Sequence, residues 1–382
     1  MMKKRFSVFT AALLLTLVAL CDEPKKAHRA KEKIAPGVVY EQISDPAGPW
    51  EVRLIRIDKE ALKKYEFRVS EAGDVCPGLE STLDAFNRAK AKKLKVIAAV
   101  NGDSYYYRDK TKLGQPRALT VVDGRFFSIG DLRNRANLFV DAADSLSIGR
   151  GSMNGSTVSI GEKNYPLVAL NDILVAGYEG VDGVFAYTSD WGRLHTPAPG
   201  IAVQLKQPYL TIPGEFKGHV EGAFPVGAVS GEFSKVVLVG FGSAAEINST
   251  PAKTTVRLNI AISPAPAAPP LKLALGAMGI IRQGEQTFFK DTGGLARHPR
   301  TFWGCGPEGV VFGVVDGRQK GWSVGMTYEE MDNLLKPYKL TSILNLDGGG
   351  STTLVIDGKI QNKPSDGAPR RTGNHLLLIR RP

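Results

Sequence analysis

Cysteine is scarce in this chain, with three cysteines among 382 residues. Two of them, Cys76 and Cys305, stand far apart, which excludes a small disulfide-stapled scaffold and favours two separately packed thiols. No tight spacing of histidine and aspartate suggests a dinuclear metal centre. No segment interleaves clustered basic residues with stacking aromatics either, so the sequence predicts no nucleic-acid partner.

The N-terminus has the features of an export signal over residues 1–20. Three basic residues precede the apolar run AALLLTLVAL, which is too short for a transmembrane helix. Cys21 follows directly, as at the cleavage and acylation site of a bacterial lipoprotein, although Leu20 stands where a small residue is preferred. We therefore expect an exported cell-envelope protein, anchored through lipid on Cys21 or otherwise periplasmic or secreted.

The remaining chain is basic. Residues 1–20 hold three basic and no acidic residues, so their removal lowers the formal charge from +11 to +8. Such a charge favours anionic partners, for example a phosphate-linked glycoconjugate or envelope polymer, and diffuse surface lysine explains it equally well. Residues 21–35 are densely charged and almost free of apolar side chains, which predicts a flexible tether. Residues 36–382 then form a single main domain.

Strand patterns dominate that domain. Segments such as WEVRLIRID, KVVLVGF and TVRLNIAI alternate apolar and polar residues between Gly-, Pro- and Asn-rich turns. Helical periodicity is confined to a few segments, among them 79–95 and 328–336. The predicted fold class is α+β or mixed α/β, a strand-rich twisted sheet with a few packed helices.

A recurrent unit places Asp-Gly after a pair of apolar residues, at Asp123, Asp316 and Asp357. Asp-Gly between β-branched runs is a strong hairpin signal, because both turn residues take positive φ. We interpret Asp123 and Asp357 as turn residues. Asp316 occupies the same slot but lies in a more polar stretch, so both a turn role and a chemical role stay open.

The two helical segments share a continuation: each runs into an apolar strand that ends in Asn-x-Asp. Side chains alternate along a strand, so residues two apart project from the same face. Polar pairs at the ends of buried strands are a usual place for a ligand. The two pairs are Asn101 with Asp103 and Asn345 with Asp347.

The stretch NLDGGGSTT is the most informative one. Three consecutive glycines allow close backbone approach to a ligand, and hydroxyl side chains follow them, which together suit a phosphate. No lysine follows the glycines, so this is not a Walker loop. A glycine-rich bend between two strands is the alternative. The loop consists of Gly348, Gly349, Gly350, Ser351 and Thr352.

Two further polar clusters lie in the C-terminal part. Arginine offers a planar fork that matches phosphate oxygens, so Arg300 and Arg318 are candidate anion clamps, although each alone is more often a surface ion-pair partner. His298 alone would more often be a structural histidine. Neighbouring polar residues suggest that these loops share one cleft. The other candidates are Thr301, Ser323, Asp366 and Arg371.

Over residues 96–382 the chain resembles the phosphodiester glycosidase family. The motifs that carry the resemblance are HPRT, VVDGRQKGWSVGMTYEEM, LNLDGGGSTTLVIDGKIQNKPSDG and RRTGNHLLL, with looser matches at VNGDSYY, GQPRALTVVDG and FAYTSDWG. Ser104 and Tyr105 stand where the family commonly has paired phenylalanine. The resemblance implies hydrolysis of the bond between a sugar anomeric carbon and a phosphodiester oxygen, which releases free sugar and a phosphomonoester.

The resemblance also implies roles for the candidate residues. Asp347 would act at the anomeric centre as nucleophile or water-activating base, with Asp103 or Asp316 as the second carboxylate. Arg300 and Arg318 would hold phosphate with the glycine loop, and Asn101 and Asn345 would bond sugar hydroxyls.

Two other functions fit the same residues. One is a non-catalytic binder of anionic envelope glycans. The other is a metal-dependent phosphodiesterase that cuts P–O, in which Asp103, Asp316, Asp347 and Asp366 would hold a hard cation. The glycosidase interpretation requires no cofactor, and it leaves a structural or catalytic divalent cation open.

Overall fold

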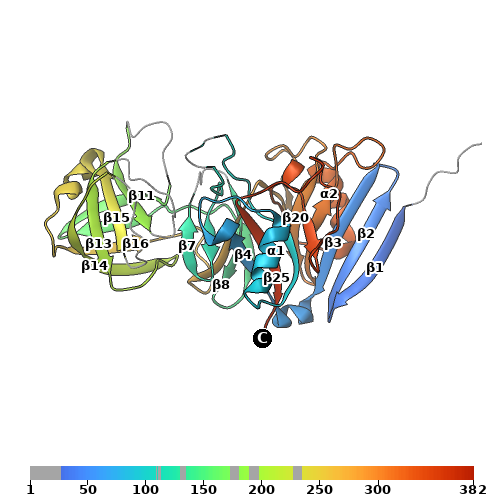
Figure 1. Cartoon of the computed structure of the whole chain (residues 1–382), viewed down its shortest axis with the longest axis horizontal. Coiled ribbons are helices and arrows are strands. Elements are labelled where there is room, and N and C mark those ends of the chain that lie inside the picture. The colour runs from blue at the N-terminus through green and yellow to red at the C-terminus, as the bar shows by residue number, and fades with distance from the viewer. Residues whose placement is uncertain are drawn as a thin grey trace, which may run out of the picture.

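The computed structural model describes residues 27–108, 110, 113–129, 135–172, 180–188, 198–226 and 235–382. In this part of the chain, 25 strands accompany two α-helices. The molecule is elongated, with a closed barrel at one end and the outer strands of a large sheet at the other (Figure 1). The α+β or mixed α/β prediction is therefore wrong, because the fold is mostly β.

The barrel closes through seven strands. The alternation of buried and exposed side chains suits a barrel. Along β16 every second residue is buried, so one face of the strand fills the interior. The neighbours β11 and β12 run parallel and the other pairs run antiparallel. In barrel order the strands are β10 (Thr157–Ile160), β11 (Lys163–Leu170), β12 (Gly183–Thr188), β15 (Lys235–Phe241), β13 (Gly200–Leu205), β14 (Gly214–Phe224) and β16 (Thr255–Ile260).

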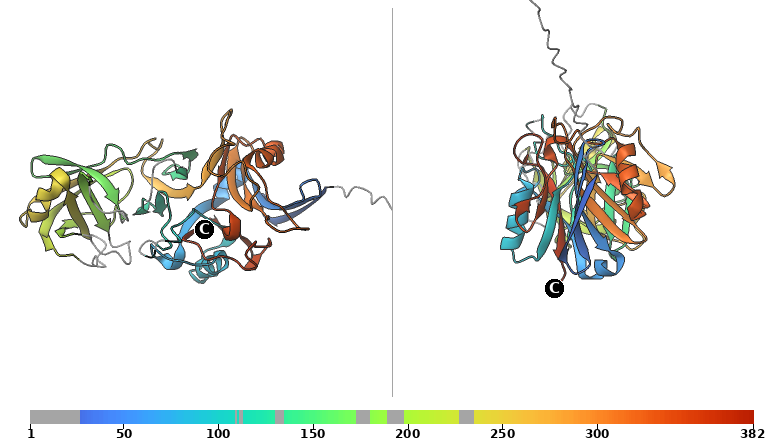
Figure 2. Two further views of the ribbon diagram at one scale, coloured as in Figure 1. Left: turned by 90° about the horizontal axis from the view of Figure 1, so that it is seen from above. Right: turned by 90° about the vertical axis from the view of Figure 1, so that its right-hand side faces the viewer.

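An eight-stranded antiparallel sheet forms the opposite end, and its outer strands are prominent in both views of Figure 2. Its central strands are buried on both faces, because α2 covers one side and the neighbouring sheets cover the other. In order the strands are β1 (His28–Ala35), β2 (Val38–Asp45), β3 (Trp50–Asp58), β21 (Gly309–Val315), β20 (Arg300–Gly306), β22 (Ser342–Asn345), β18 (Gly279–Gln283) and β19 (Gln286–Thr287).

Two five-stranded sheets complete the strand structure. They pack together through the apolar cluster that also contains Trp303 and Phe312 of the large sheet. The first has the order β7 (Arg125–Ser128), β6 (Thr120–Val122), β17 (Leu271–Ala277), β8 (Ala136–Asp141) and β9 (Leu146–Gly149); the second has β24 (Lys359–Ile360), β23 (Leu354–Ile356), β5 (Val96–Asn101), β25 (Asn374–Arg380) and β4 (Tyr65–Glu71).

The helices are short. α1 (Thr82–Ala91) packs Phe86 and Ala89 on the sheet of β5 and β25. α2 (Tyr328–Leu335) begins with the capping box of Thr327 and Glu330 that the sequence predicts. No helix within the described residues is long and apolar enough to span a membrane. The 3₁₀ turns are η1 (Lys59–Lys64), η2 (Ala72–Asp74), η3 (Gly242–Ser249), η4 (Lys336–Tyr338) and η5 (Gly349–Ser351).

The tether prediction needs correction over its second half. Residues His28–Ala35, assigned to a flexible tether, form β1 and pair with β2. Their side chains are mostly exposed, as their charge suggests, but backbone hydrogen bonds to β2 supply the order that side-chain burial does not. Residues 1–26, which include the predicted export signal and Cys21, lie outside the described part of the chain.

The two thiols pack in different places. Cys76 lies in an apolar cluster with Phe127 and Phe185, whereas Cys305 sits in β20 against the central core. The turn predictions are confirmed for Asp123 and Asp357, which have φ of 50° and 47°.

Candidate functional site

The ends of β5 and β22 meet, which brings the two Asn-x-Asp segments together. The amide N–H of Asp347 donates to the Gly102 carbonyl at 2.9 Å. The side-chain amide of Asn101 donates to the Asp347 carbonyl at 2.8 Å. These bonds join two sheets at the point where both strands stop, so Asp103 and Asp347 lie at one site.

Asp103 and Asp347 form a pair of interacting carboxylates. Asp103 is fully buried and accepts from the Ala118 N–H at 2.8 Å and the Ser104 hydroxyl at 3.3 Å. Asp347 is half-buried and accepts from the Gly348 N–H at 3.0 Å. Burial raises the pKa of each carboxyl to about 6, and the charge of Asp103 contributes to the raised pKa of Asp347. Close to neutral pH the pair therefore holds and releases a proton readily.

Arginine and tyrosine side chains surround this pair. Arg370 donates to Asp366 through Nε at 3.0 Å and Nη2 at 2.5 Å, and its charge lowers the pKa of Asp347. Gly350 permits this approach, because a Cβ there would collide with both side chains. Tyr105 is near enough that the charge of Asp347, second to burial, raises its pKa.

Arg318 lies against the glycine loop. Its Nη1 would be 3.0 Å from a Cβ on Gly349, a residue whose φ is +63°. Its Nη2 is 3.3 Å from Nδ1 of His298. Burial and the charges of Arg300 and Arg318 lower the pKa of His298, which favours the neutral imidazole. Arg318 is exposed, so a phosphate can reach it.

The glycine loop is not the open phosphate cradle that the sequence predicts. Most of its N–H groups already have partners within the protein, and η5 tightens it into a 3₁₀ turn. Ser351 and Thr352 are buried beneath the turn. The loop instead positions Asp347 and leaves room for the arginines. The bonded N–H groups are those of Gly348 to Asp347 Oδ1, Gly349 to the Pro299 carbonyl, Ser351 to the Gly348 carbonyl, and Thr352 to the Gly349 carbonyl.

Arg300 does not act as the predicted anion clamp. Its Nε donates to the Met326 carbonyl at 2.9 Å, and its Nη2 donates to the carbonyls of Gly293 and Ala296 at 2.9 and 2.6 Å. The guanidinium also stacks on Tyr328, with 4.8 Å to the ring centroid. Only 4% of Arg300 is exposed, so its fork ties a loop to α2 and is not presented to a ligand.

Asp316 is likewise a structural carboxylate, which contradicts its prediction as a catalytic candidate. It is buried, and burial raises its pKa. It accepts from Trp322 Nε1 at 2.9 Å, from Asn362 Nδ2 at 3.0 Å, and from the Lys363 N–H at 3.0 and 3.1 Å. These bonds hold the loops after β21 and β24 together.

Other predicted contacts also turn inward. Asn101 accepts from the Thr301 hydroxyl at 2.7 Å and from the Thr353 N–H at 3.1 Å, so it joins strands and does not face a sugar. Asn345 is buried and donates to the Leu346 carbonyl, and Ser323 is buried and donates to the Asp316 carbonyl. Arg371 bonds to the Leu79 carbonyl, away from the carboxylate pair.

The predicted site residues omit Arg370, which stands next to the predicted Arg371. No local signal separates two adjacent arginines. In the structure Arg370 pairs with Asp366, whereas Arg371 donates to the Leu79 carbonyl. Tyr105 is also missing from the predicted residues; its position two residues after Asp103 was the available signal.

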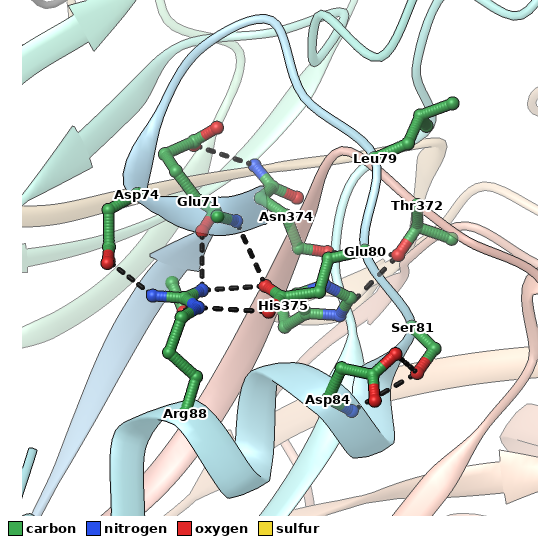
Figure 3. A network of polar contacts seen from close by, with 12 residues as sticks. Glu71, Asp74, Leu79, Glu80, Ser81, Asp84, Arg88, Thr372, Asn374 and His375 are labelled. Carbon is green, nitrogen blue, oxygen red and sulfur yellow. Dashed lines mark hydrogen bonds and ion pairs between the residues drawn. The ribbon is translucent and has the colours of Figure 1, made fainter. Parts of the chain in front are cut away.

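Glu71, Asn374 and Arg88 belong to one polar network (Figure 3). Asn374 Oδ1 accepts from the Asp103 N–H at 2.8 Å, and its Nδ2 donates to Glu71 at 3.5 Å. Burial, with a contribution from the charge of Asp103, raises the pKa of Glu71 to about 8. Burial lowers the pKa of His375 to about 4. Arg88 donates to the Glu71 carbonyl at 2.7 Å, so α1 is tied to the strand that carries Glu71.

Two neighbouring carboxylates with arginines beside them suit hydrolysis of a bond to a sugar or a phosphate. No cluster of three or more His, Cys, Asp or Glu side chains suited to a metal ion occurs within the described ranges.

Comparison with known proteins narrows this class. Residues 218–379 match the model of the phosphodiester glycosidase family, which confirms the resemblance over that part of the chain. Asp347, Arg318 and Arg370 lie inside the matched residues, and Asp103 lies outside them. No curated protein matches the chain.

Two solved structures share the fold. A hypothetical protein from Synechocystis has a TM-score of 0.71 at 17% identity; the alignment covers 94% of this chain and 64% of that one. A Burkholderia pseudomallei protein with a predicted export assignment has a TM-score of 0.66 at 18% identity, covering 92% and 96%. The zebrafish N-acetylglucosamine-1-phosphodiester alpha-N-acetylglucosaminidase catalytic domain, auto-inhibited by its propeptide, has a TM-score of 0.47 at 13% identity, covering 94% and 89%.

Proposed function

We propose that this chain is an exported phosphodiester glycosidase. It hydrolyses the C–O bond between a sugar anomeric carbon and a phosphodiester oxygen, and it releases free sugar and a phosphomonoester. The observation that carries the proposal is the Asp103–Asp347 pair, flanked by Arg318 and Arg370, in a chain whose residues 218–379 match this family.

Asp347 acts at the anomeric carbon. It is the half-buried member of the pair, so it is the carboxylate that a substrate can reach. As nucleophile it would form a glycosyl ester that water then cleaves; as base it would take a proton from the attacking water. In either case its carboxylate must be ionised, so activity should fall as the pH drops through about 6.

Asp103 acts through Asp347. It is fully buried, so it acts on Asp347 through its charge and does not contact the substrate. Its negative charge disfavours a second negative charge on Asp347 and thereby raises the basicity of that carboxylate. A phosphate leaving group needs little protonation, so one carboxylate at the carbon and cations at the phosphate are sufficient.

Arg318 and Arg370 hold the phosphate. Arg318 is exposed beside Gly349, and Arg370 carries a charge that reaches Asp347. A guanidinium stabilises the charge that develops on the departing phosphate oxygen. Asp366, ion-paired with Arg370, fixes the direction of that side chain.

Export and lipidation belong to the same proposal. The basic and apolar start followed by Cys21 supports them, and the Burkholderia protein of similar fold has a predicted export assignment. Mass spectrometry of the mature N-terminus tests this directly. An unmodified chain that begins elsewhere than Cys21 would remove lipidation and leave secretion standing.

Chromatography of the products from a panel of sugar-1-phosphodiesters, run with and without chelator, tests the reaction. Free sugar plus phosphomonoester supports the glycosidase. A sugar phosphate would indicate P–O cleavage, and absence of turnover across the panel would indicate a binding protein. Asp347→Asn provides the blank for contaminating hydrolases.

A further inference from the structure

A cavity of about 620 Å³ lies far from the carboxylate pair. It opens between β4, an edge strand, and the sheet of β8, β9 and β17, and Arg381 at the C-terminal end also lines it. β25 begins at Asn374 beside Asp103 and ends at Arg380 beside the cavity. At about 3.4 Å per residue, this strand separates the two places by about 20 Å.

Part of the cavity wall is apolar. Phe67 from β4, Val140 from β8 and Leu273 from β17 line this part, together with Leu62 and Leu146. Val140 and Leu273 are 7% and 3% exposed and belong to the central core, so the wall is rigid. The volume is within the range of small-molecule sites, about 300–1,000 Å³.

The rim of the cavity is charged, with four cationic side chains and three carboxylates. One carboxylate, Asp144, serves two cations: Lys272 Nζ is 2.8 Å from its Oδ1, and Arg381 Nη2 is 2.9 Å from its Oδ2. Two positive groups on one carboxylate leave an excess positive charge at the edge of an apolar wall. Arg68 is paired with Asp123.

We propose that this cavity binds an amphipathic anion, with its apolar chain against Phe67, Val140 and Leu273 and its anionic head at Lys272 and Arg381. An apolar wall with a few convergent polar groups is the usual composition of a ligand site. The head group adds the negative charge that Asp144 alone does not supply. This site is separate from the carboxylate pair, so it stands whether or not the proposed reaction is correct.

Decanoate and its neutral amide, titrated into the full chain by ligand-observed NMR, test the proposal. Decanoate should bind about threefold more tightly than decanamide, the scale of one partly exposed ion pair. The double variant Lys272→Gln/Arg381→Gln should abolish that preference. Leu62→Glu should weaken both ligands about tenfold, because it places a carboxylate in the apolar wall.

Two control variants locate the ligand. Lys163→Gln removes an exposed, ion-paired lysine on the barrel and should leave decanoate binding unchanged. Arg318→Gln should also leave it unchanged. The proposal is overturned if neither ligand binds, if wild-type protein does not prefer the anion, or if Arg318→Gln abolishes binding that the Lys272/Arg381 variant retains. Leu62→Glu also risks misfolding. If its melting temperature falls, the test rests on the Lys272 and Arg381 variants alone.

Discussion

Along β14 and β16 of the barrel, buried and exposed side chains alternate, and the buried ones are almost all apolar. β20 and β21 of the large sheet are buried on both faces over most of their length. The buried carboxylates of the described residues all lie outside residues 157–260; they are Glu41, Glu71, Asp103, Asp141, Asp316 and Asp332.

The difference separates scaffold from chemistry. A buried carboxylate costs free energy unless it is bonded, paired or protonated, so its presence needs a reason. For Asp316, four hydrogen bonds that join loops offset this free-energy cost. Asp103 and Asp347 interact with each other, and the charge of Asp103 adds to burial in raising the pKa of Asp347. In the proposed function their region carries the reaction, and the barrel contributes packing.

The largest expected effect is on Asp347. Asp347→Asn keeps the shape but removes the charge of a nucleophile or base, so kcat should fall by at least ~10²-fold. The melting temperature should change little. Both quantities are measured on one preparation. A destabilised variant with near-normal turnover would make Asp347 a structural residue.

Asp316→Ala is the matched comparison. It leaves the Trp322, Asn362 and Lys363 donors without their acceptor, so it should cost roughly 1–3 kcal/mol in the free energy of unfolding. Turnover per folded molecule should stay near wild type. Loss of turnover at full stability would return Asp316 to the catalytic residues.

The second prediction concerns Glu71 and pH. Its pKa is raised to about 8 from 4.5, so the stability it contributes falls as pH rises through this window. The raised pKa values of Asp103 and Asp347 change the stability only up to about pH 6. The lowered pKa of His375 changes it between about pH 4 and 6.5. Between pH 6.5 and 8 the free energy of unfolding should therefore drop, at most about 1.4 kcal/mol per pH unit.

Urea denaturation of wild type and Glu71→Gln at pH 6.5 and 8 measures this drop. The variant stays neutral, so its stability should be flatter over the same interval. Equal slopes for the two proteins would mean that Glu71 is ionised throughout or is not buried in solution.

The third prediction contrasts two arginines. Arg318→Lys should lower kcat/KM about tenfold on a phosphodiester, because an ammonium cannot reproduce a bidentate contact. Arg300→Lys should instead lower the melting temperature and leave kcat/KM of the folded protein near wild type. The reverse pattern would restore Arg300 as the phosphate ligand.

The smallest expected effect is in the barrel. Ile260→Val removes one methyl group from a fully buried side chain and should cost about 1 kcal/mol of stability. Activity per folded molecule should not change. A specific loss of kcat would show that the barrel shapes the site, and the division between scaffold and chemistry would fail.

Several local features were determined by the sequence alone. The segment WEVRLIRID predicts β3, and Thr327 with Glu330 predicts the start of α2. Asp123 and Asp357 take the positive φ that Asp-Gly turns require. Each of these depends on interactions within a few residues, such as side-chain alternation, a cap or a turn, and so is visible in the local pattern.

Tertiary structure decided the rest. The barrel closes by pairing β10 with β16, whose residues are about a hundred positions apart, and no local pattern specifies that partner. Asp316 and Asp357 share the same Asp-Gly context, yet one is a buried acceptor and the other an exposed turn. Arg300 and Arg318 look equivalent in the sequence. In the structure the Arg300 guanidinium is bonded to backbone carbonyls, whereas Arg318 lies beside the glycine loop. A side chain's chemistry depends on which groups surround it, and distant parts of the chain supply those groups.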